Sequence, residues 1–402
     1  MPYYAQKTRR NTNTNYRGRS NFGRSGGGSR RGPAKAYIHP SKFVQSAKPR
    51  AEVVYEPTHS FADFDMHDLL KNSLAKKGFT TPSAIQDQAI PPALLGKDVV
   101  GIANTGTGKT LAFGLPLLNK LITDPASHAL ILAPTRELAQ QIEDEFKSVA
   151  RGSGLYGALL IGGSSMGTQL RDLKSSPRVV VGTPGRVKDH IERGTLFISK
   201  FNIIVLDEVD RMLDMGFIQD MRDILEKLNP TRQSYFFSAT LDSKVKTLIN
   251  TFSSDPVTIS VKTGETSENV EQDIVPYQTH DEKIDQLHNL LASEAVVKAL
   301  VFDETQRSVE KLSNELLSRG FKADAIHGGK SQGQRQRALD KFKKSHVNIL
   351  VATDVAARGI DVTDITHVIN YSQPQAYDDY IHRIGRAGRA GRTGFAFTFV
   401  KA

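Results

Sequence analysis

Residues 98–118 read "DVVGIANTGTGKTLAFGLPLL", an apolar run that is followed by a glycine-rich loop and by a second apolar stretch. The first run is typical of a buried strand, and the stretch after Lys109 favours a helix. Gly106 and Gly108 let successive backbone N–H groups turn toward one point, as a phosphate group requires. This order of strand, loop and helix is the setting of a P-loop, and it predicts an α/β sheet that binds a nucleotide.

The loop itself supplies the candidate nucleotide-binding residues. In a P-loop the lysine reaches the β- and γ-phosphates, and the hydroxyl residue after it faces Mg²⁺. Lys109 and Thr110 stand at these two positions, whereas the first glycine of the usual pattern is Ala103 in this chain. The residues that we expect to contact the nucleotide are Thr105, Gly106, Thr107, Gly108, Lys109 and Thr110.

A second motif, "LDEVDRM" at 206–212, follows a hydrophobic run and places three acidic residues within four positions. Clustered carboxylates repel one another, so they need a cation or a basic partner. In P-loop enzymes a second strand ends in an Asp that holds Mg²⁺, and Asp207 fits this position. Glu208 is then placed to accept a proton from an attacking water molecule.

Short strand-like runs alternate with amphipathic stretches over most of the chain. This alternation is typical of parallel sheets with helices on both faces, and a polar stretch, "KTGETSEN", interrupts it. We therefore predict two α/β domains, 59–261 and 270–402, joined by a linker at 262–269. The expected strands are 98–103, 129–133, 178–183, 202–208 and 234–240 in the first domain, and 299–303, 322–328, 347–353, 366–371 and 395–400 in the second.

Charge is unevenly placed along the 402 residues. Residues 1–50 hold 12 Lys and Arg and no Asp or Glu, whereas the other 352 residues hold 41 basic and 43 acidic side chains. We expect residues 1–58 to form a disordered Arg/Gly-rich tail, because this composition buries too little apolar surface to fold. Such a tail attracts the phosphate backbone of RNA, although the same composition also suits a solubilising arm.

The chain contains no cysteine, so it has no disulfide and no thiolate metal site. No apolar run approaches the roughly 20 residues of a membrane span, and the N-terminus has no apolar signal region. We therefore expect a protein that is neither secreted nor membrane-bound. We place it in the cytoplasm and leave the nucleus open.

From about Phe61 to its end the sequence resembles the DEAD-box family of ATP-dependent RNA helicases, with "DEVD" at 207–210 as a variant of the family's motif. The stretch "GFTTPSAIQ" at 78–86 is similar to the family's Q motif. The resemblance implies that Gln86 contacts adenine and that Phe61 stacks on the adenine ring, so the nucleotide would be ATP. The amide of Gln86 suits this role, because it can donate and accept hydrogen bonds at the N6/N7 edge.

Further motifs follow in the family's order. They are "PTRELA" at 134–139, a glycine pair and "TPGR" at 183–186, and then "HGG" at 327–329, "TDVAARGID" at 353–361 and "YIHRIGRAGR" at 380–389. The implied RNA contacts go to phosphate and sugar, so they would be largely independent of base sequence. The implied RNA-binding residues are Pro134, Thr135, Arg136, Gly162, Gly163, Thr183, Arg186 and Thr353.

The resemblance also implies an α/β fold of two RecA-like domains, in which the second domain completes the ATP site. Arg386 and Arg389 match arginine fingers, which stabilise charge on the γ-phosphoryl group, and Asp361 matches a ribose contact. The "SAT" at 238–240 matches the motif that couples hydrolysis to RNA binding. We expect Asp210 to pair with polar groups around Ser238 and Thr240, or with groups of the second domain when the cleft closes. The implied coupling residues are Asp210, Ser238, Thr240 and His382.

Taken together, these expectations make the chain an RNA-dependent ATPase that unwinds or remodels short RNA duplexes and RNA–protein complexes. Its cofactors would be ATP and Mg²⁺, with the metal held by Thr110 and Asp207. An alternative is a weakly catalytic RNA clamp or annealing factor driven by the basic tail. A DNA helicase of the wider superfamily is a third possibility, against which the Q motif argues. The residues expected to carry catalysis are Lys109, Asp207, Glu208, Arg386 and Arg389.

Overall fold

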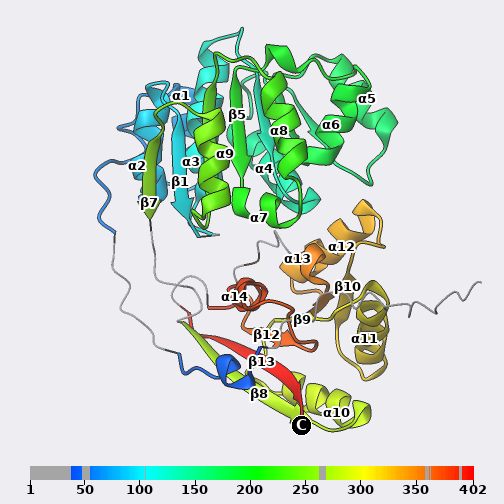
Figure 1. Ribbon diagram of the computed structural model, residues 1–402. Coiled ribbons are helices and arrows are strands. Elements are labelled where there is room, and N and C mark those ends of the chain that lie inside the picture. The colour runs from blue at the N-terminus through cyan, green and yellow to red at the C-terminus, as the bar shows by residue number, and fades with distance from the viewer. Residues whose placement is uncertain are drawn as a thin grey trace, which may run out of the picture. The chain divides into compact units, whose positions relative to one another are not determined.

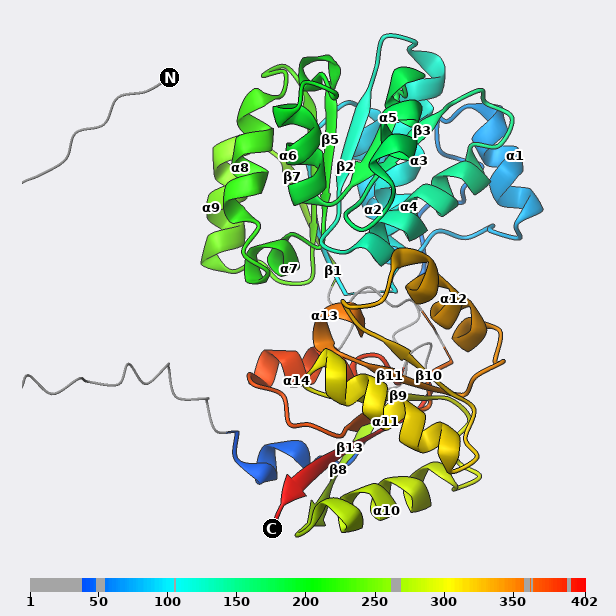
Figure 2. The same cartoon turned by 90° about the vertical axis from the view of Figure 1, so that its right-hand side faces the viewer.

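The computed structural model of the chain describes residues 38–47, 55–104, 106–261, 269–357, 362, 364–388 and 392–402. These residues form two domains, each built on one parallel sheet that has helices on both of its faces (Figures 1 and 2). This confirms the predicted fold class. Every helix in the described part of the chain is too short or too polar to span a membrane.

The sheet of the first domain has seven strands in the order β3-β4-β2-β5-β6-β1-β7, and all neighbours are parallel. The five strands expected from the sequence are present, and β3 and β7 extend the sheet at its two edges. The strands are β1 Val99–Ala103, β2 Ala129–Leu132, β3 Gly157–Leu160, β4 Val179–Gly182, β5 Ile203–Asp207, β6 Gln233–Ser238 and β7 Val257–Val261.

Two hydrophobic cores cover the faces of this sheet, because successive side chains of a strand point to opposite faces. Val99 packs with α1 to α4 in one core, and its neighbour Val100 packs with α6 to α9 in the other. The helices are α1 Asp68–Lys76, α2 Ala84–Leu94, α3 Lys109–Thr123, α4 Arg136–Val149, α5 Met166–Lys174, α6 Pro184–Glu192, α7 Val209–Asp214, α8 Ile218–Lys227 and α9 Ser243–Phe252, with a 3₁₀ turn at Ile198–Lys200.

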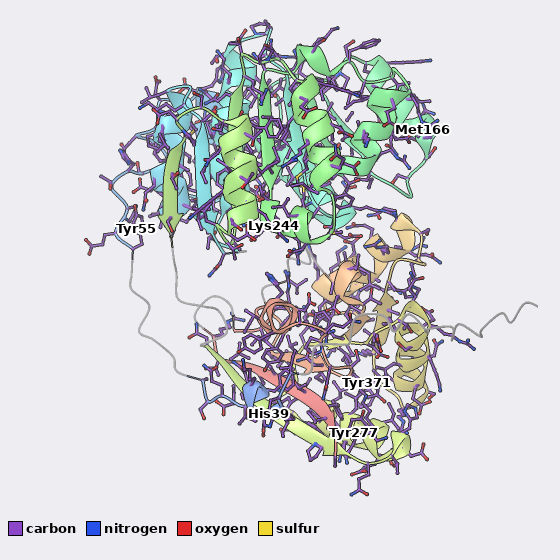
Figure 3. The ribbon with its side chains drawn as sticks, in the orientation of Figure 1. His39, Tyr55, Met166, Lys244, Tyr277 and Tyr371 are labelled. Carbon is purple, nitrogen blue, oxygen red and sulfur yellow. The ribbon has the colours of Figure 1, made fainter. Side chains whose placement is uncertain are left out.

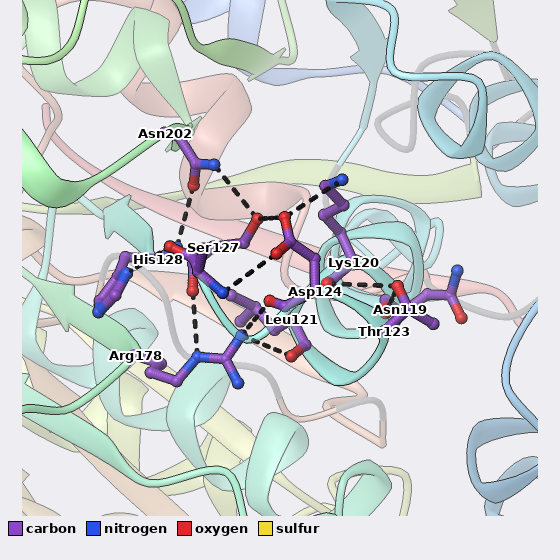
Figure 4. A network of polar contacts seen from close by, with 10 residues as sticks. Asn119, Lys120, Leu121, Thr123, Asp124, Ser127, His128, Arg178 and Asn202 are labelled. Atoms are coloured by element: carbon purple, nitrogen blue, oxygen red, sulfur yellow. Dashed lines mark hydrogen bonds and ion pairs between the residues drawn. The ribbon is translucent and has the colours of Figure 1, made fainter.

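Arg178, just before β4, fastens the far end of α3 to the sheet (Figure 4). Its guanidinium group donates to the backbone oxygens of Leu121 at 2.6 Å, Asp124 at 2.5 Å and Ser127 at 3.1 Å. These are carbonyl groups at the C-terminal end of a helix and in the turn after it, where the regular hydrogen bonds of the helix run out. The opposite end of α3, which follows the glycine-rich loop, is thereby held on a fixed scaffold.

The sheet of the second domain has six parallel strands in the order β10-β11-β9-β12-β13-β8. The five expected strands are present, and β8 is added at one edge. One core contains α12 to α14 and the other contains α10 and α11. The elements are β8 Val270–Tyr277, β9 Ala299–Phe302, β10 Ala323–Ile326, β11 Ile349–Ala352, β12 His367–Asn370, β13 Gly394–Lys401, α10 His280–Leu291, α11 Gln306–Ser318, α12 Gln332–Lys343, α13 Asp354–Ala357 and α14 Tyr377–Ile384.

The predicted tail needs one correction. Residues 38–47 lie against β8 and β13 of the second domain, with a 3₁₀ turn at Pro40–Phe43, and residues 55–58 pack on the first domain (Figure 1). A disordered tail that runs unbroken to residue 58 is therefore wrong for these two segments. They attach through single side chains and backbone hydrogen bonds, which composition cannot detect. Residues 1–37 and most of the expected linker, 262–268, lie outside the described part of the chain.

Candidate active site

The glycine-rich loop connects β1 to α3, as the sequence predicted. Gly106 and Gly108 have φ angles of 83° and 91°, which side-chain-bearing residues rarely adopt. A Cβ atom at Gly108 would also lie 2.4 Å from Nε2 of Gln86, so no larger residue fits there. Because α3 begins directly after this loop, the positive end of its dipole and its first N–H groups face the loop. This is a site that favours an anion such as phosphate.

Lys109, the first residue of α3, supplies the charge of the site. Its side chain is buried, and Nζ has no hydrogen-bond partner among the described residues. A buried ammonium group without partners costs free energy, so the group is suited to an anionic ligand. The triphosphate of a nucleotide would supply the missing acceptors, and the residues of the loop therefore fit the expected substrate.

Asp207 and Glu208 lie at the carboxyl end of β5, and both are buried. Burial raises the pKa of Asp207 to about 6, although the charge of Lys109 opposes this rise. Burial also acts to raise the pKa of Glu208, but the positive charges of Arg211 and Lys109 outweigh it and lower that pKa to about 2. Nη1 of Arg211 lies 2.5 Å from Oε2 of Glu208. The acidic cluster is thus balanced by two basic side chains.

Glu208 also has an unusual backbone conformation, with φ 53° and ψ 56°. Left-handed angles are uncommon for a residue other than glycine and tend to occur at functional sites. The backbone N–H of Glu208 donates to Oδ1 of Asp207 at 3.0 Å, which holds the two carboxylates in a fixed relation.

Asp210 forms the pairing expected from the sequence. Its Oδ2 accepts hydrogen bonds from the backbone N–H groups of Ala239 at 3.0 Å and Thr240 at 2.9 Å, and from Oγ1 of Thr240 at 3.1 Å. The backbone N–H of Asp210 donates to Oγ of Ser238 at 3.3 Å. The end of β6 is therefore tied to the acidic motif by one carboxylate. The coupling role of this contact stays a prediction.

Gln86 binds the glycine-rich loop instead of pointing free into a ligand site. Its Nε2 donates to the backbone oxygen of Gly108 at 3.0 Å, and its Oε1 accepts from the backbone N–H of Ser83 at 2.9 Å. The amide keeps one further donor and one further acceptor capacity. Phe61 is 4 % exposed and lies edge-on to Phe64, in the core. The adenine contacts expected for Gln86 and Phe61 stay predictions.

A magnesium site fits the residues present. Thr110 follows Lys109 in the first turn of α3 and is half-buried. The described residues contain no group of three or more His, Cys, Asp or Glu side chains that could hold a metal by themselves. Mg²⁺ commonly uses one or two protein oxygens together with water and substrate phosphates. Asp207 and Thr110 offer such a donor pair.

The expected RNA-binding residues of the first domain begin helices that follow neighbouring strands. Thr135 is the N-cap of α4 and Thr183 is the N-cap of α6. Nη1 of Arg186 is buried and has no hydrogen-bond partner among the described residues, which suits a phosphate oxygen. Six of the expected residues line one hollow, namely Pro134, Thr135, Arg136, Gly162, Thr183 and Arg186.

The glycine pair makes room for Arg136. A Cβ atom at Gly163 would lie 2.1 Å from Nη1 of Arg136, and one at Gly162 would lie 3.2 Å from Nη2. Gly163 also has a positive φ of 75°. Any larger residue at Gly163 would displace the guanidinium group, so the pair positions Arg136 beside the loop.

In the second domain one buried arginine is paired within its own domain. Arg383 in α14 donates to both carboxylate oxygens of Asp354, at 2.5 Å and 2.6 Å, and to the backbone oxygen of Ser372 at 2.7 Å. Arg386 follows α14 and is 5 % exposed. His382 lies in the last turn of α14 and is exposed. Thr353 directly follows β11 and is half-buried. Thr105, Asp361 and Arg389 lie outside the described residues.

Three residues of structural importance were not expected from the sequence. Asp87 accepts hydrogen bonds from Tyr55 and from the backbone of residues 58 and 59, Arg211 pairs with Glu208, and Arg383 pairs with Asp354. The spacing of three positions between Glu208 and Arg211 is a helical signal that could have revealed their pair. The partners of Asp87 and the carboxylate partner of Arg383 lie 28 or more positions away, and no local pattern indicates them.

Family models and curated proteins agree on what this chain resembles. Residues 83–248 match the model described as DEAD/DEAH box helicase, and residues 282–391 match the one described as helicase conserved C-terminal domain. The DEAD-box ATP-dependent RNA helicase CshA of Bacillus subtilis is 43% identical over 345 residues, which are 85% of this chain and 70% of the relative. ATP-dependent RNA helicase CshA of Listeria monocytogenes is 44% identical over 346 residues, 85% of this chain and 66% of the relative.

Solved structures give the same result. Dbp5 of Saccharomyces cerevisiae, bound to RNA and ADP BeF3, aligns with a TM-score of 0.74 and 30% identity, covering 85% of this chain and 90% of that one. A DEAD box protein of Methanococcus jannaschii is 40% identical with a TM-score of 0.50, covering 85% and 93%. The likeness confirms RecA-like domains and an enzyme that uses ATP and binds RNA. The chain therefore belongs to the DEAD-box family of ATP-dependent RNA helicases.

Proposed function

We propose that this helicase hydrolyses ATP only slowly until RNA binds, and that it uses the cycle to separate or remodel short RNA duplexes and RNA–protein complexes. The observation that carries the proposal is the buried, unpartnered ammonium group of Lys109 beside two buried carboxylates. Such a group is unfavourable in an empty site and favourable once a polyphosphate occupies it.

In this proposal the first domain binds ATP. Lys109 and the N–H groups of residues 106–110 hold the phosphates, and Asp207 and Thr110 hold Mg²⁺. The bound ion would neutralise charge on the β- and γ-phosphates. Glu208 orients the attacking water molecule. The unused hydrogen-bonding capacity of Gln86 would face adenine, with Phe61 stacking on the ring.

RNA contact is assigned to sugar and phosphate groups. The hollow lined by Thr135, Arg136, Thr183 and Arg186 offers helix N-termini and guanidinium groups, which bind phosphate without reading bases. We therefore propose RNA binding that is largely independent of sequence, to single strands or duplex ends. Thr353 would add a contact from the second domain.

Coupling follows if RNA favours one arrangement of the domains. Arg386, together with Arg389, would stabilise charge on the γ-phosphoryl group only in that arrangement. Asp210 would transmit the change in domain arrangement from the acidic motif to Ser238 and Thr240, with which it already forms hydrogen bonds. A cytoplasmic location, where ATP and RNA are both present, suits this function and a chain without cysteine.

The test is steady-state ATP hydrolysis by the full chain with duplex RNA, single-stranded RNA, DNA of the same sequence, and no nucleic acid. We expect stimulation by RNA and little by DNA. Glu208→Gln should keep ATP and RNA binding but lose roughly 10²–10⁴-fold in turnover. Glu226→Gln in α8, an exposed position, is the matched control and should behave as wild type.

Two results would contradict the proposal. Equal stimulation by DNA would place the chain among nucleic-acid helicases that do not select RNA. Tight RNA binding without measurable turnover in the wild-type chain would instead support the RNA clamp.

A further inference from the structure

Residues 38–47 dock on the second domain, although the whole first domain separates the two in sequence. Phe43 is fully buried in one core of the second domain, where the other members include Val270 and Tyr380. Gln45 and Gln272 exchange two backbone hydrogen bonds, of 3.0 Å and 2.8 Å, which adds an antiparallel bridge to the edge of β8. Figure 3 shows His39 of this segment beside the strands of the second domain.

The segment contacts α14 through two aromatic side chains. The rings of Phe43 and Tyr380 have centroids 4.8 Å apart, and the hydroxyl of Tyr380 donates to Oε1 of Gln272 at 2.9 Å. Nζ of Lys42 lies 5.2 Å from the ring centre of Tyr377, within the range of a cation–π contact. Phe43 thus fills the space between β8 and the helix that leads to Arg386.

The loop after α14 rests on the same strand. Gly388 has a positive φ of 67°, and a Cβ atom there would lie 2.9 Å from a methyl group of Val270. Arg386 lies between α14 and Gly388, so its backbone is supported from the helix on one side and from β8 on the other. Both α14 and β8 contact residues 38–47.

We propose that residues 38–47 are a positioning element for ATP hydrolysis, which holds α14 and β8 so that Arg386 keeps its productive orientation. The inference rests on the proposed role of Arg386. Packed cores have few alternative arrangements of similar energy, so loss of the Phe43 ring would let α14 shift or fluctuate. A displacement of about 1 Å at a group that stabilises a transition state can cost up to roughly 10²-fold in rate. Phe43 is a positioning residue and touches no reactant.

The test compares Phe43→Ala with Val44→Ala in the full chain. Val44 is the next residue and is 52 % exposed, so its variant controls for a change in the segment that leaves the core intact. We expect Phe43→Ala to lower RNA-stimulated kcat about tenfold while KM for ATP stays within about twofold, because the side chains proposed to hold the phosphates and adenine lie in the first domain. Val44→Ala should match wild type, and Phe43→Leu should recover most of the loss.

A second experiment measures whether residues 38–47 remain docked, and it does not depend on ATP hydrolysis. Amide hydrogen exchange across residues 377–388 should accelerate in Phe43→Ala and not in Val44→Ala. Gln45→Pro is a variant that leaves the core volume unchanged and removes the N–H that donates to Gln272. It should accelerate the same exchange and lower kcat, whereas Ser46→Pro, at an exposed position outside the bridge, should do neither.

Wild-type kcat in a variant whose α14 has lost protection would overturn the proposal. So would an equal loss of kcat in Phe43→Ala and Val44→Ala. If the wild-type chain shows no RNA-stimulated hydrolysis, the proposed function itself fails. That outcome is distinct, because the exchange experiment would still report whether the segment docks.

Discussion

The two domains share a parallel sheet with helices on both faces, but one buried cation of the first, Lys109, and one of the second, Arg383, differ in their hydrogen bonds. In the first domain Lys109 is buried without a hydrogen-bond partner among the described residues. In the second, Arg383 is equally buried and donates to Asp354, Asn370 and Ser372. A charge that the fold leaves unpaired is available to a ligand, whereas one that the fold pairs internally holds its own domain together.

The largest effect should come from Lys109→Ala. Turnover should fall by at least roughly 10²–10³-fold, because the phosphate charge loses its fixed partner. Stability without nucleotide should stay within about 1 kcal/mol of wild type, because removing a buried ammonium group that lacks hydrogen bonds offsets the loss of the positive charge near Asp207 and Glu208. Lys97→Ala, at an exposed position before β1, is the control for both measurements. A large loss of stability in Lys109→Ala would show that the lysine has a structural role and would break the comparison.

Arg383→Ala should behave in the opposite way. It leaves the half-buried carboxylate of Asp354 without its partner and removes the donor to Asn370 and Ser372, and the loss of such charge-assisted hydrogen bonds typically costs about 1–3 kcal/mol. Urea unfolding of the full chain should show this loss in the transition of the second domain. Arg337→Ala, on the exposed side of α12, should change stability by less than about 0.5 kcal/mol. If the two variants unfold alike, the Arg383 network does not stabilise its domain.

Removal of residues 1–37 separates the tail from the folded domains. The deletion stops before the docked segment and removes nine basic residues, which are Lys7, Arg9, Arg10, Arg17, Arg19, Arg24, Arg30, Arg31 and Lys35. RNA affinity at low salt should fall about tenfold and depend less on salt, because fewer phosphates are neutralised. Turnover at saturating RNA should be unchanged. An unaltered salt dependence would mean that RNA affinity comes from the domains alone.

The smallest effect of a substitution in the acidic motif should come from Val209→Ala, which restores the alanine of the DEAD motif. Val209 is fully buried at the start of α7, and it has no hydrogen-bonding side-chain group. Removing its two methyl groups should cost roughly 2 kcal/mol of stability through lost burial and a small cavity. RNA-stimulated turnover should stay within about threefold, which is under about 1 kcal/mol in the barrier. A tenfold change in turnover with normal folding would show that Val209 tunes the coupling.

The sequence indicated where most of the candidate site residues lie, because the motifs that carry them are local. The glycine-rich loop, the acidic motif and the glycine pair are each short stretches between predictable elements, and the structure brings Asp210 to Ser238 and Thr240 as expected. Gln86 shows the limit of such reasoning. The amide side chain of Gln86 is chemically suited to adenine, but its orientation depends on the backbone N–H of Ser83 and on the carbonyl of Gly108.

The features that the sequence did not predict depend on contacts between residues far apart in the chain. Phe43 is one aromatic residue in a polar stretch, and its partner Tyr380 lies near the other end of the chain. The edge strand β8 mixes polar and apolar residues and contains Pro276, a residue that edge strands tolerate and that weakens a strand prediction. Composition therefore assigned residues 38–47 to a tail, because neither the docked segment nor the strand that receives it has a clear pattern.

The docked segment changes how the chain connects its domains. Residues 48–54 join the segment to Tyr55, which binds the first domain through Asp87, and residues 262–268 join β7 to the second domain. Each connection has eight Cα–Cα steps between described ends, so neither can span more than roughly 26–29 Å whatever its conformation. The chain therefore connects the first domain to the second at two places, one at each end of the first domain. If Arg386 acts on ATP held by the first domain, as proposed, two short tethers would keep it at an effective concentration of about millimolar or more around that nucleotide.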